Sequence, residues 1–127
     1  MSAHALKSWQ ARKISQITCQ VVKLDDFKPV QTLQKLNFIK IDVEGAELPS
    51  LRGAENILRK HKPILFIEGC KAWMKSFHYT PMEMDTFLTS LGYTNFKVVD
   101  KTTFNIKSIE SFIKSKRDEE SFNFLIS

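Results

Sequence analysis

One stretch, residues 37–47, constrains the fold of this chain more than any other. It reads Asn-Phe-Ile-Lys-Ile-Asp-Val-Glu-Gly-Ala-Glu, and its first part is rich in strand-forming residues. At Glu44 and Gly45 the pattern changes to one that favours a helix. A nearly continuous apolar strand is typical of a parallel sheet covered on both faces, and ligands of such sheets bind beyond the carboxyl ends of the strands. Asp42, Glu44 and Glu47 therefore lie where chemistry is expected.

The composition favours a single domain with a hydrophobic core. The chain has 127 residues, of which 43% are hydrophobic and 11% aromatic, and this is enough to bury a core. We expect one domain over residues 1–127, with a loose arm at 1–16 and an α/β core over 17–127.

Charge and cysteine content argue against several classes of partner. The net charge of +5 comes from lysines scattered along the chain, so we expect no nucleic-acid partner. No apolar window reaches the roughly 18 residues of a membrane span, so we expect no membrane partner. Cys19 and Cys70 lie far apart without metal-ligand spacing, which is typical of free thiols in a reducing compartment. These features predict a soluble, cytoplasmic protein.

A strand, a helix and a second strand follow one another through the middle of the chain. Residues 48–60 place five apolar residues on one helical face, and Gly53 predicts a pause or a close approach within this helix. The second apolar run, residues 63–69, ends in an acid and a glycine like the first. This order predicts a βαβ unit with a right-handed crossover.

The remaining segments give weaker signals, with one exception. Thr80-Pro81-Met82-Glu83 is a capping box with proline at the first helical position, and it predicts a helix that stops at Gly92. We expect an aromatic loop at 70–79, strands at 94–100 and 121–127, and a short helical connector at 108–117. Residues 17–22 are rich in β-formers, and 24–27 could start a helix with aspartate near its positive end.

Several blocks of the chain together resemble the FkbM-type S-adenosylmethionine-dependent methyltransferases. These blocks are Leu-Asp-Asp-Phe at 24–27, Phe-Ile-Lys-Ile-Asp-Val-Glu-Gly-Ala-Glu at 38–47, Leu-Arg-Gly-Ala at 51–54, Lys-Pro at 62–63 before Glu68, and Asn-Phe-Leu-Ile at 123–126. The resemblance implies a Rossmann-like α/β methyltransferase sheet. It also implies S-adenosylmethionine as the cofactor and a small-molecule acceptor, typically a hydroxyl oxygen of a sugar, polyketide or similar metabolite.

The chain departs from this family at the cofactor turn. Members bind the cofactor with a glycine-rich turn after the first strand, whereas this chain has only four glycines, none close to another. We therefore expect a partial sheet of about four to five strands with flanking helices, in which the amino-terminal half is missing and strand 37–44 lies at an edge. Such an edge needs a cover. The amino-terminal arm, a second copy in a homodimer, or a separate complementing chain could supply it, and a truncated or mis-started gene product is equally compatible with the sequence.

The candidate site residues cluster at the ends of the two apolar strands. Asp42 and Glu68 could face one crevice, with Asp42 as a base or as an orienting hydrogen-bond acceptor. We take Asp42, Glu44, Glu68 and His78 as catalytic candidates, and Asp42 and Glu44 as cofactor-binding candidates.

Each candidate also has a structural alternative. Asp42 could anchor the turn that follows it, Glu47 suits a helix amino terminus without any function, and His78 could pack an aromatic loop onto the core. Two adjacent carboxylates could hold a divalent cation, but no dedicated ligand cluster is present, so we predict no metal site.

Two hypotheses about function follow from these observations. The first is a partial methyltransferase domain that acts on a hydroxyl oxygen once cofactor-binding strands are supplied. The second is a non-catalytic remnant that serves as an interaction or dimerisation module through its uncovered strand.

Overall fold

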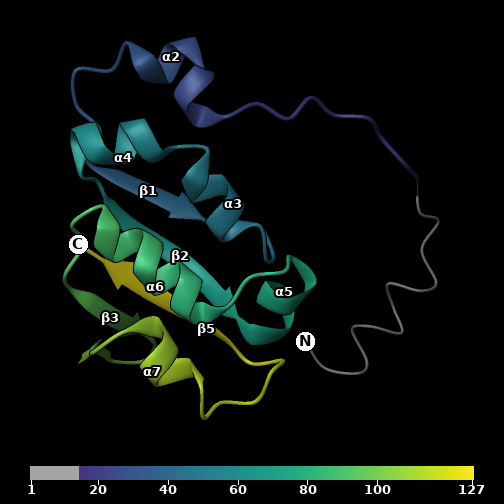
Figure 1. Ribbon diagram of the computed structural model, residues 1–127, viewed down its shortest axis with the longest axis vertical. Helices are drawn as coiled ribbons and strands as arrows, with labels where there is room; N and C mark the ends of the chain where they lie inside the picture. The colour runs from purple at the N-terminus through teal and green to yellow at the C-terminus, as the bar shows by residue number, and fades with distance from the viewer. Residues whose placement is uncertain (1–14) are drawn as a thin grey trace.

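A computed structural model describes residues 15–127 of the chain. The loose arm expected at 1–16 therefore lies almost entirely outside the described residues. A five-stranded mixed sheet forms the centre, in the order β1-β2-β5-β3-β4 (Figure 1). The strands are β1 (Phe38–Ile41), β2 (Ile64–Cys70), β3 (Phe96–Val99), β4 (Thr103–Ile106) and β5 (Ser121–Ile126).

The parallel pair β1 and β2 carries the predicted βαβ unit. Phe38 pairs with Ile64 and Ile41 with Ile67, and every other pair of neighbouring strands is antiparallel. β1 lies at the edge of the sheet, as the partial resemblance predicted. The mixed α/β sheet with flanking helices agrees with a partial Rossmann-like methyltransferase fold.

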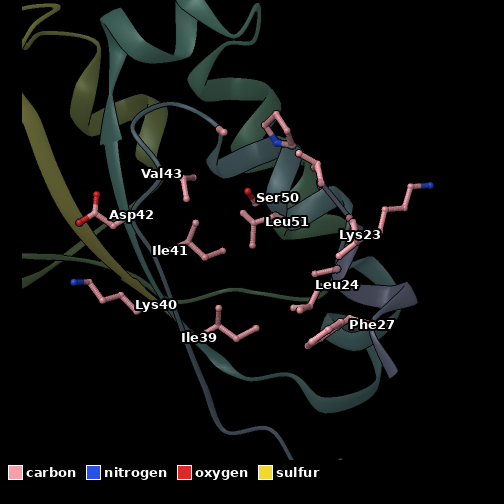
Figure 2. Close-up of a pocket in the computed structure, with 16 residues that line it drawn as sticks. Lys23, Leu24, Phe27, Ile39, Lys40, Ile41, Asp42, Val43, Ser50 and Leu51 are labelled. Carbon is pink, nitrogen blue, oxygen red and sulfur yellow. The ribbon is translucent and has the colours of Figure 1, made fainter. Parts of the chain in front are cut away.

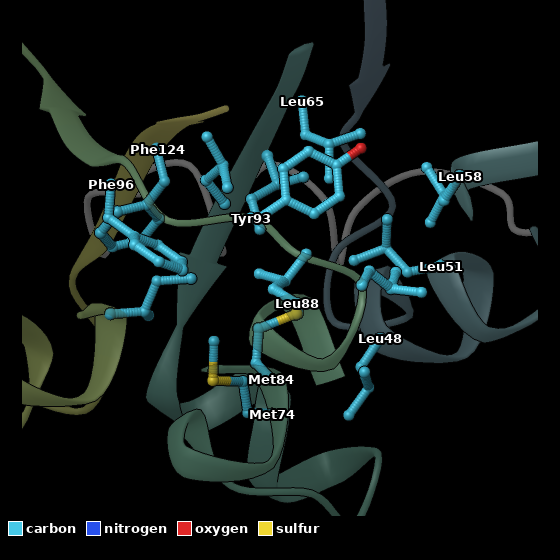
Figure 3. Close-up of a cluster of buried hydrophobic side chains, with 14 of the residues drawn as sticks. Leu48, Leu51, Leu58, Leu65, Met74, Met84, Leu88, Tyr93, Phe96 and Phe124 are labelled. Carbon is cyan, nitrogen blue, oxygen red and sulfur yellow. The ribbon is translucent and has the colours of Figure 1, made fainter. Parts of the chain in front are cut away.

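The hydrophobic core lies on one face of the sheet. Strand residues that point to this face, such as Leu65, Ile67 and Phe124, are at most 1% exposed. They pack against apolar residues of the helices (Figure 3). These helices are α3 (Glu47–Arg52), α4 (Glu55–His61), α5 (Lys71–Ser76), α6 (Pro81–Ser90) and α7 (Ile109–Ile113).

The opposite face of the sheet is open in the part of the chain that the structure describes. Phe38 and Ile64, which point to this face, are 51% and 43% exposed. A sheet covered on both faces was expected from the apolar strands, and only one face is covered by residues 15–127.

The predicted helix after β1 is broken at Gly53. α3 ends at Arg52 and α4 begins at Glu55, with Ala54 at its N-cap and therefore no capping side chain. Asp25 supplies the cap from a distance, because its carboxylate accepts hydrogen bonds from the backbone N–H groups of Asn56 (2.9 Å) and Ile57 (3.0 Å). Asp25 and Asp26 lie in the first turn of the short helix η1 (Leu24–Asp26), as expected, and α2 (Lys28–Gln31) follows. Asp25 in addition lies at the positive end of α4.

The capping box before α6 is confirmed. The Thr80 hydroxyl accepts from the Glu83 backbone N–H (3.2 Å), and the Glu83 carboxylate accepts from the Thr80 N–H (2.7 Å). The helix ends at Ser90, and Gly92 takes a left-handed conformation with φ of +89°.

One local expectation was wrong, and two features of the structure were not predicted. Residues 71–76 form the helix α5 within the segment that was expected to be a loop. This helix was missed because it has only six residues and buries chiefly Met74, which leaves too little periodicity to recognise. β4 was missed because it has only four residues, three of them exposed, so that its short alternation of polar and apolar residues was not recognised. Residues 17–22 form no strand, since no neighbouring strand pairs with them in the described structure.

No helix within 15–127 combines the length and the apolar character needed to cross a bilayer.

The distant cap on α4 gives a first prediction. Asp25→Ala removes the acceptor of two backbone N–H groups, so we expect a loss of about 1 kcal/mol of unfolding free energy and a melting temperature lower by about 4 °C. Thermal denaturation followed by circular dichroism measures this. Asp26→Ala changes the neighbouring exposed acid and serves as the control. Equal melting temperatures of the two variants would contradict the capping role.

Candidate functional site

Two carboxylates lie side by side at the carboxyl ends of β1 and β2. Because Ile41 pairs with Ile67, the next residues along the two strands, Asp42 and Glu68, are neighbours that point to the same face. Their side chains lie within hydrogen-bonding reach of each other. We call these two residues the acidic pair. Figure 2 shows the side chain of Asp42 pointing away from Ile41, toward the open face of the sheet.

The environment of the acidic pair favours a bound proton. Partial burial raises the pKa of Glu68 above its ordinary value of 4.5, and both the hydrogen bond to Asp42 and the negative charge of Asp42 raise it further. The hydroxyl of Ser121, on β5, opposes this shift by hydrogen bonding to the Glu68 carboxylate. Two carboxylates this close do not ionise independently. The pair therefore binds a proton at a higher pH than an isolated glutamate does.

A buried glutamate holds the turn that follows Asp42. Glu47, the first residue of α3, is 1% exposed, and its carboxylate accepts hydrogen bonds from the backbone N–H groups of Val43 (3.1 Å) and Gly45 (3.0 Å). Its negative charge also contributes to the raised pKa of Glu68. Glu47 thus stabilises the turn that positions Asp42, and it is not free to bind a ligand.

The remaining candidates lie around this turn. Glu44 is exposed and takes a left-handed conformation with φ of 50°, and Gly45 beside it has φ of 113°. A Cβ atom added to Gly45 would meet the ring of Phe77 at 2.7 Å, so the turn is packed tightly against the end of α5. Strained backbone of this kind is often found at functional sites.

His78 follows Phe77 and is not joined to the acidic pair. It also has a positive φ, of 59°, and its backbone N–H donates to the carbonyl of Lys75 (3.0 Å). Its side chain is exposed, and in residues 15–127 the imidazole forms neither a hydrogen bond nor an ion pair. The structure therefore brings together Asp42 and Glu68, places Glu44 on the adjoining turn, and leaves His78 on the segment that packs against that turn.

Tyr79 was not singled out by the sequence as a site residue. Its side chain is 5% exposed, and its hydroxyl lies near the Glu47 carboxylate and the Leu48 backbone without a hydrogen bond of ordinary geometry within the described residues. Burial, followed by the negative charge of Glu47, raises the pKa of this phenol. Only its place in the aromatic segment 70–79 could have drawn attention to it.

The described residues do not form a glycine cradle for a nucleotide-like cofactor. The space that a Cβ would occupy at Gly69 holds the ring of Phe124 (2.7 Å), and at Gly92 it holds the Lys62 ammonium (2.9 Å). Gly53 faces the backbone of Lys23 at 3.6 Å. Residues 15–127 also contain no group of three or more His, Cys, Asp or Glu side chains that could hold a metal ion.

The parallel βαβ unit with acids at its carboxyl edge defines an α/β domain of the kind that binds ligands at the ends of its strands. The family model described as Methyltransferase FkbM domain matches residues 2–94. The match spans well over half of the chain and includes β1, β2 and the helices through α6. The chain therefore belongs to the FkbM methyltransferase domain family. No curated protein and no solved structure gave a significant match.

The turn after β1 gives a second prediction. Gly45→Ala places a side chain on a left-handed backbone and against Phe77, so we expect it to lower the unfolding free energy by at least about 2 kcal/mol. Gly53→Ala is the matched control, because Gly53 has a right-handed φ of −73° and only ordinary contacts from 3.5 Å. This control is expected to be neutral or stabilising by about 0.5 kcal/mol. Urea denaturation measures both, and similar losses in the two variants would contradict the packing argument.

The acidic pair gives a third prediction, about pH. Because the pKa of Glu68 is raised in the folded state, its contribution to stability is greatest below pH 4.5 and is lost as the pH rises through the raised pKa. Glu68→Gln removes this loss, so its melting temperature at neutral pH is expected to exceed that of the original chain by roughly 2 °C. The difference should disappear at pH 4 or below. Glu119→Gln, at an exposed position, is the control, and a gain that is independent of pH would contradict the prediction.

Proposed function

We propose that this chain is the acceptor-binding part of an S-adenosylmethionine-dependent methyltransferase that methylates a hydroxyl oxygen of a sugar or other small metabolite. The observation that carries the proposal is the acidic pair at the carboxyl ends of β1 and β2. Membership of the FkbM methyltransferase domain family supports methyl transfer as the reaction.

The acidic pair suits the proton chemistry of such a reaction. When bound, the donor supplies a methyl carbon on a positively charged sulfur, and the carbon–sulfur bond breaks as the acceptor oxygen bonds to that carbon. Asp42 accepts the hydrogen bond of the acceptor hydroxyl and orients its oxygen. The hydroxyl proton then passes to the acidic pair, in which Glu68 already has a raised affinity for protons. Few other catalytic groups are needed, because alignment of the reacting atoms provides most of the rate enhancement.

We assign binding roles to the residues around the acidic pair. Asp42 and Glu44 offer carboxylate oxygens to the hydroxyl and ammonium groups of the donor at the edge of the sheet. His78 lies on the segment whose Phe77 packs against Gly45, and with that aromatic segment it lines the acceptor side.

The donor site needs further residues. Because no glycine of the described residues faces an open cradle, we propose that the rest of the donor is held by residues outside 15–127 or by a complementing chain. The free edge of β1 is the place where such residues would join the sheet.

Calorimetry with S-adenosylmethionine on the purified chain tests this function and gives the fourth prediction. We expect a dissociation constant of roughly 0.1 mM, because only part of the donor's contacts are present. Asp42→Asn is expected to weaken binding at least tenfold. Asp100→Asn, an exposed acid in the turn between β3 and β4, is the control and is expected to bind like the original chain. Transfer of a labelled methyl group to a panel of sugars then identifies the acceptor.

The second candidate function is a non-catalytic interaction module, and the uncovered edge of β1 favours it. Absence of any binding heat at millimolar donor, together with a stable oligomer, would contradict the methyltransferase proposal and support this module.

A further inference from the structure

Residues 77–79 contact the turn after β1 at two points. At the first point the ring of Phe77 fills the space beside Gly45, where an added Cβ atom would lie 2.7 Å from it. At the second point the hydroxyl of Tyr79 lies near the Glu47 carboxylate. The first contact is apolar and tightly packed, whereas the second joins two polar groups.

The polar groups of the two buried tyrosines are satisfied unequally. The chain has two tyrosines, of which Tyr79 is 5% and Tyr93 is 2% exposed. The Tyr93 hydroxyl donates to the Pro63 carbonyl (2.8 Å) within the buried cluster of Figure 3, whereas the Tyr79 hydroxyl has no hydrogen bond of ordinary geometry within residues 15–127. A buried hydroxyl without a partner destabilises the folded state, and a phenyl ring would fill the same space without this cost. Packing therefore does not account for the hydroxyl of Tyr79.

The Glu47 carboxylate has room for a further donor. One of its oxygens accepts a hydrogen bond from the Val43 N–H and the other accepts one from the Gly45 N–H, although a carboxylate oxygen can accept two. Because the Glu47 side chain is 1% exposed, solvent does not readily supply the remaining donors. A buried donor without a partner and a buried acceptor with spare capacity thus lie next to each other.

Tyr79 is anchored, whereas the turn is able to adjust. The Tyr79 N–H donates to the Met74 carbonyl (3.1 Å), and Thr80, the next residue, is the N-cap of α6. The turn contains two consecutive residues with positive φ, Glu44 at 50° and Gly45 at 113°, and this backbone is strained at the glutamate. A ligand that binds at the turn can therefore shift it while the Tyr79 hydroxyl stays in place.

We propose that Tyr79 is a positioning residue for Asp42 and Glu44: when a ligand binds beside them, the Tyr79 hydroxyl donates a hydrogen bond to the Glu47 carboxylate. Because Glu47 holds the turn, this bond fixes Asp42 and Glu44 in the geometry that the ligand selects. The bond forms only in the bound state, so it strengthens binding and adds nothing to the stability of the free chain. The inference rests on the proposed function, which supplies the ligand, S-adenosylmethionine.

Carbon NMR of the two tyrosines tests this bond and gives the fifth prediction. With the tyrosine Cζ atoms isotopically labelled, the chain gives two resonances, which Tyr79→Phe and Tyr93→Phe assign. Hydrogen-bond donation by a phenol moves its Cζ resonance downfield. We expect the Tyr79 resonance to move downfield when S-adenosylmethionine is added and the Tyr93 resonance to stay where it is.

The same two variants form a matched pair, since each removes one buried hydroxyl. Tyr79→Phe is expected to melt no lower than the original chain and to bind the donor about fivefold more weakly, which is the loss of one hydrogen bond. Tyr93→Phe loses its bond to Pro63, so we expect it to melt about 4 °C lower and to bind the donor like the original chain. Circular dichroism and calorimetry measure the two quantities.

The possible failures have different signatures. Absence of donor binding by the original chain would overturn the proposed function, and this inference with it. Donor binding that is equally tight in the original chain and in Tyr79→Phe, or a Tyr79 resonance that the donor leaves unchanged, would overturn the inference alone. A melting temperature lowered as much in Tyr79→Phe as in Tyr93→Phe would also overturn it, because the hydroxyl would then already be bonded in the free chain.

Discussion

The parallel pairing of β1 with β2 is the constraint on which the rest of the structure depends. It fixes Ile41 opposite Ile67 and so brings Asp42 and Glu68, 26 positions apart in the sequence, to one edge of the sheet. The crossover helices α3 and α4 stabilise this pairing, because their buried leucines pack on the same side of the sheet as Leu65 and Ile67. The electrostatics of the acidic pair and the free edge of β1 are both consequences of this arrangement.

The predictable parts of the molecule are those encoded by residues close together in sequence. β1, β2 and α6 were recognised because each has an uninterrupted apolar pattern or a capping box within a few residues. The acidic pair was also predicted, since parallel strands joined by a crossover end at the same edge. Asp25 and the backbone N–H groups that it caps at the start of α4 are more than thirty residues apart in the sequence. No local sequence pattern predicts such a contact. α5 and β4 are too short, and β4 too exposed, for periodicity to reveal them.

Within the described residues, apolar surface stays exposed on one face of the sheet and beside the edge of β1. The helices cover only one face of the sheet, and Phe38 and Ile64 on the other face are about half exposed. In this chain the acids remain at the strand ends while the glycine cradle is absent from the described residues.

The two hydrogen bonds of Glu47 have a consequence for how the acidic edge is built. The two hydrogen bonds join Glu47 to residues only two and four positions earlier in the chain. The shape of the turn is therefore stabilised by contacts within residues 43–47. The turn that positions Asp42 is therefore fixed locally by Glu47, whereas Glu68 also depends on Ser121 of β5.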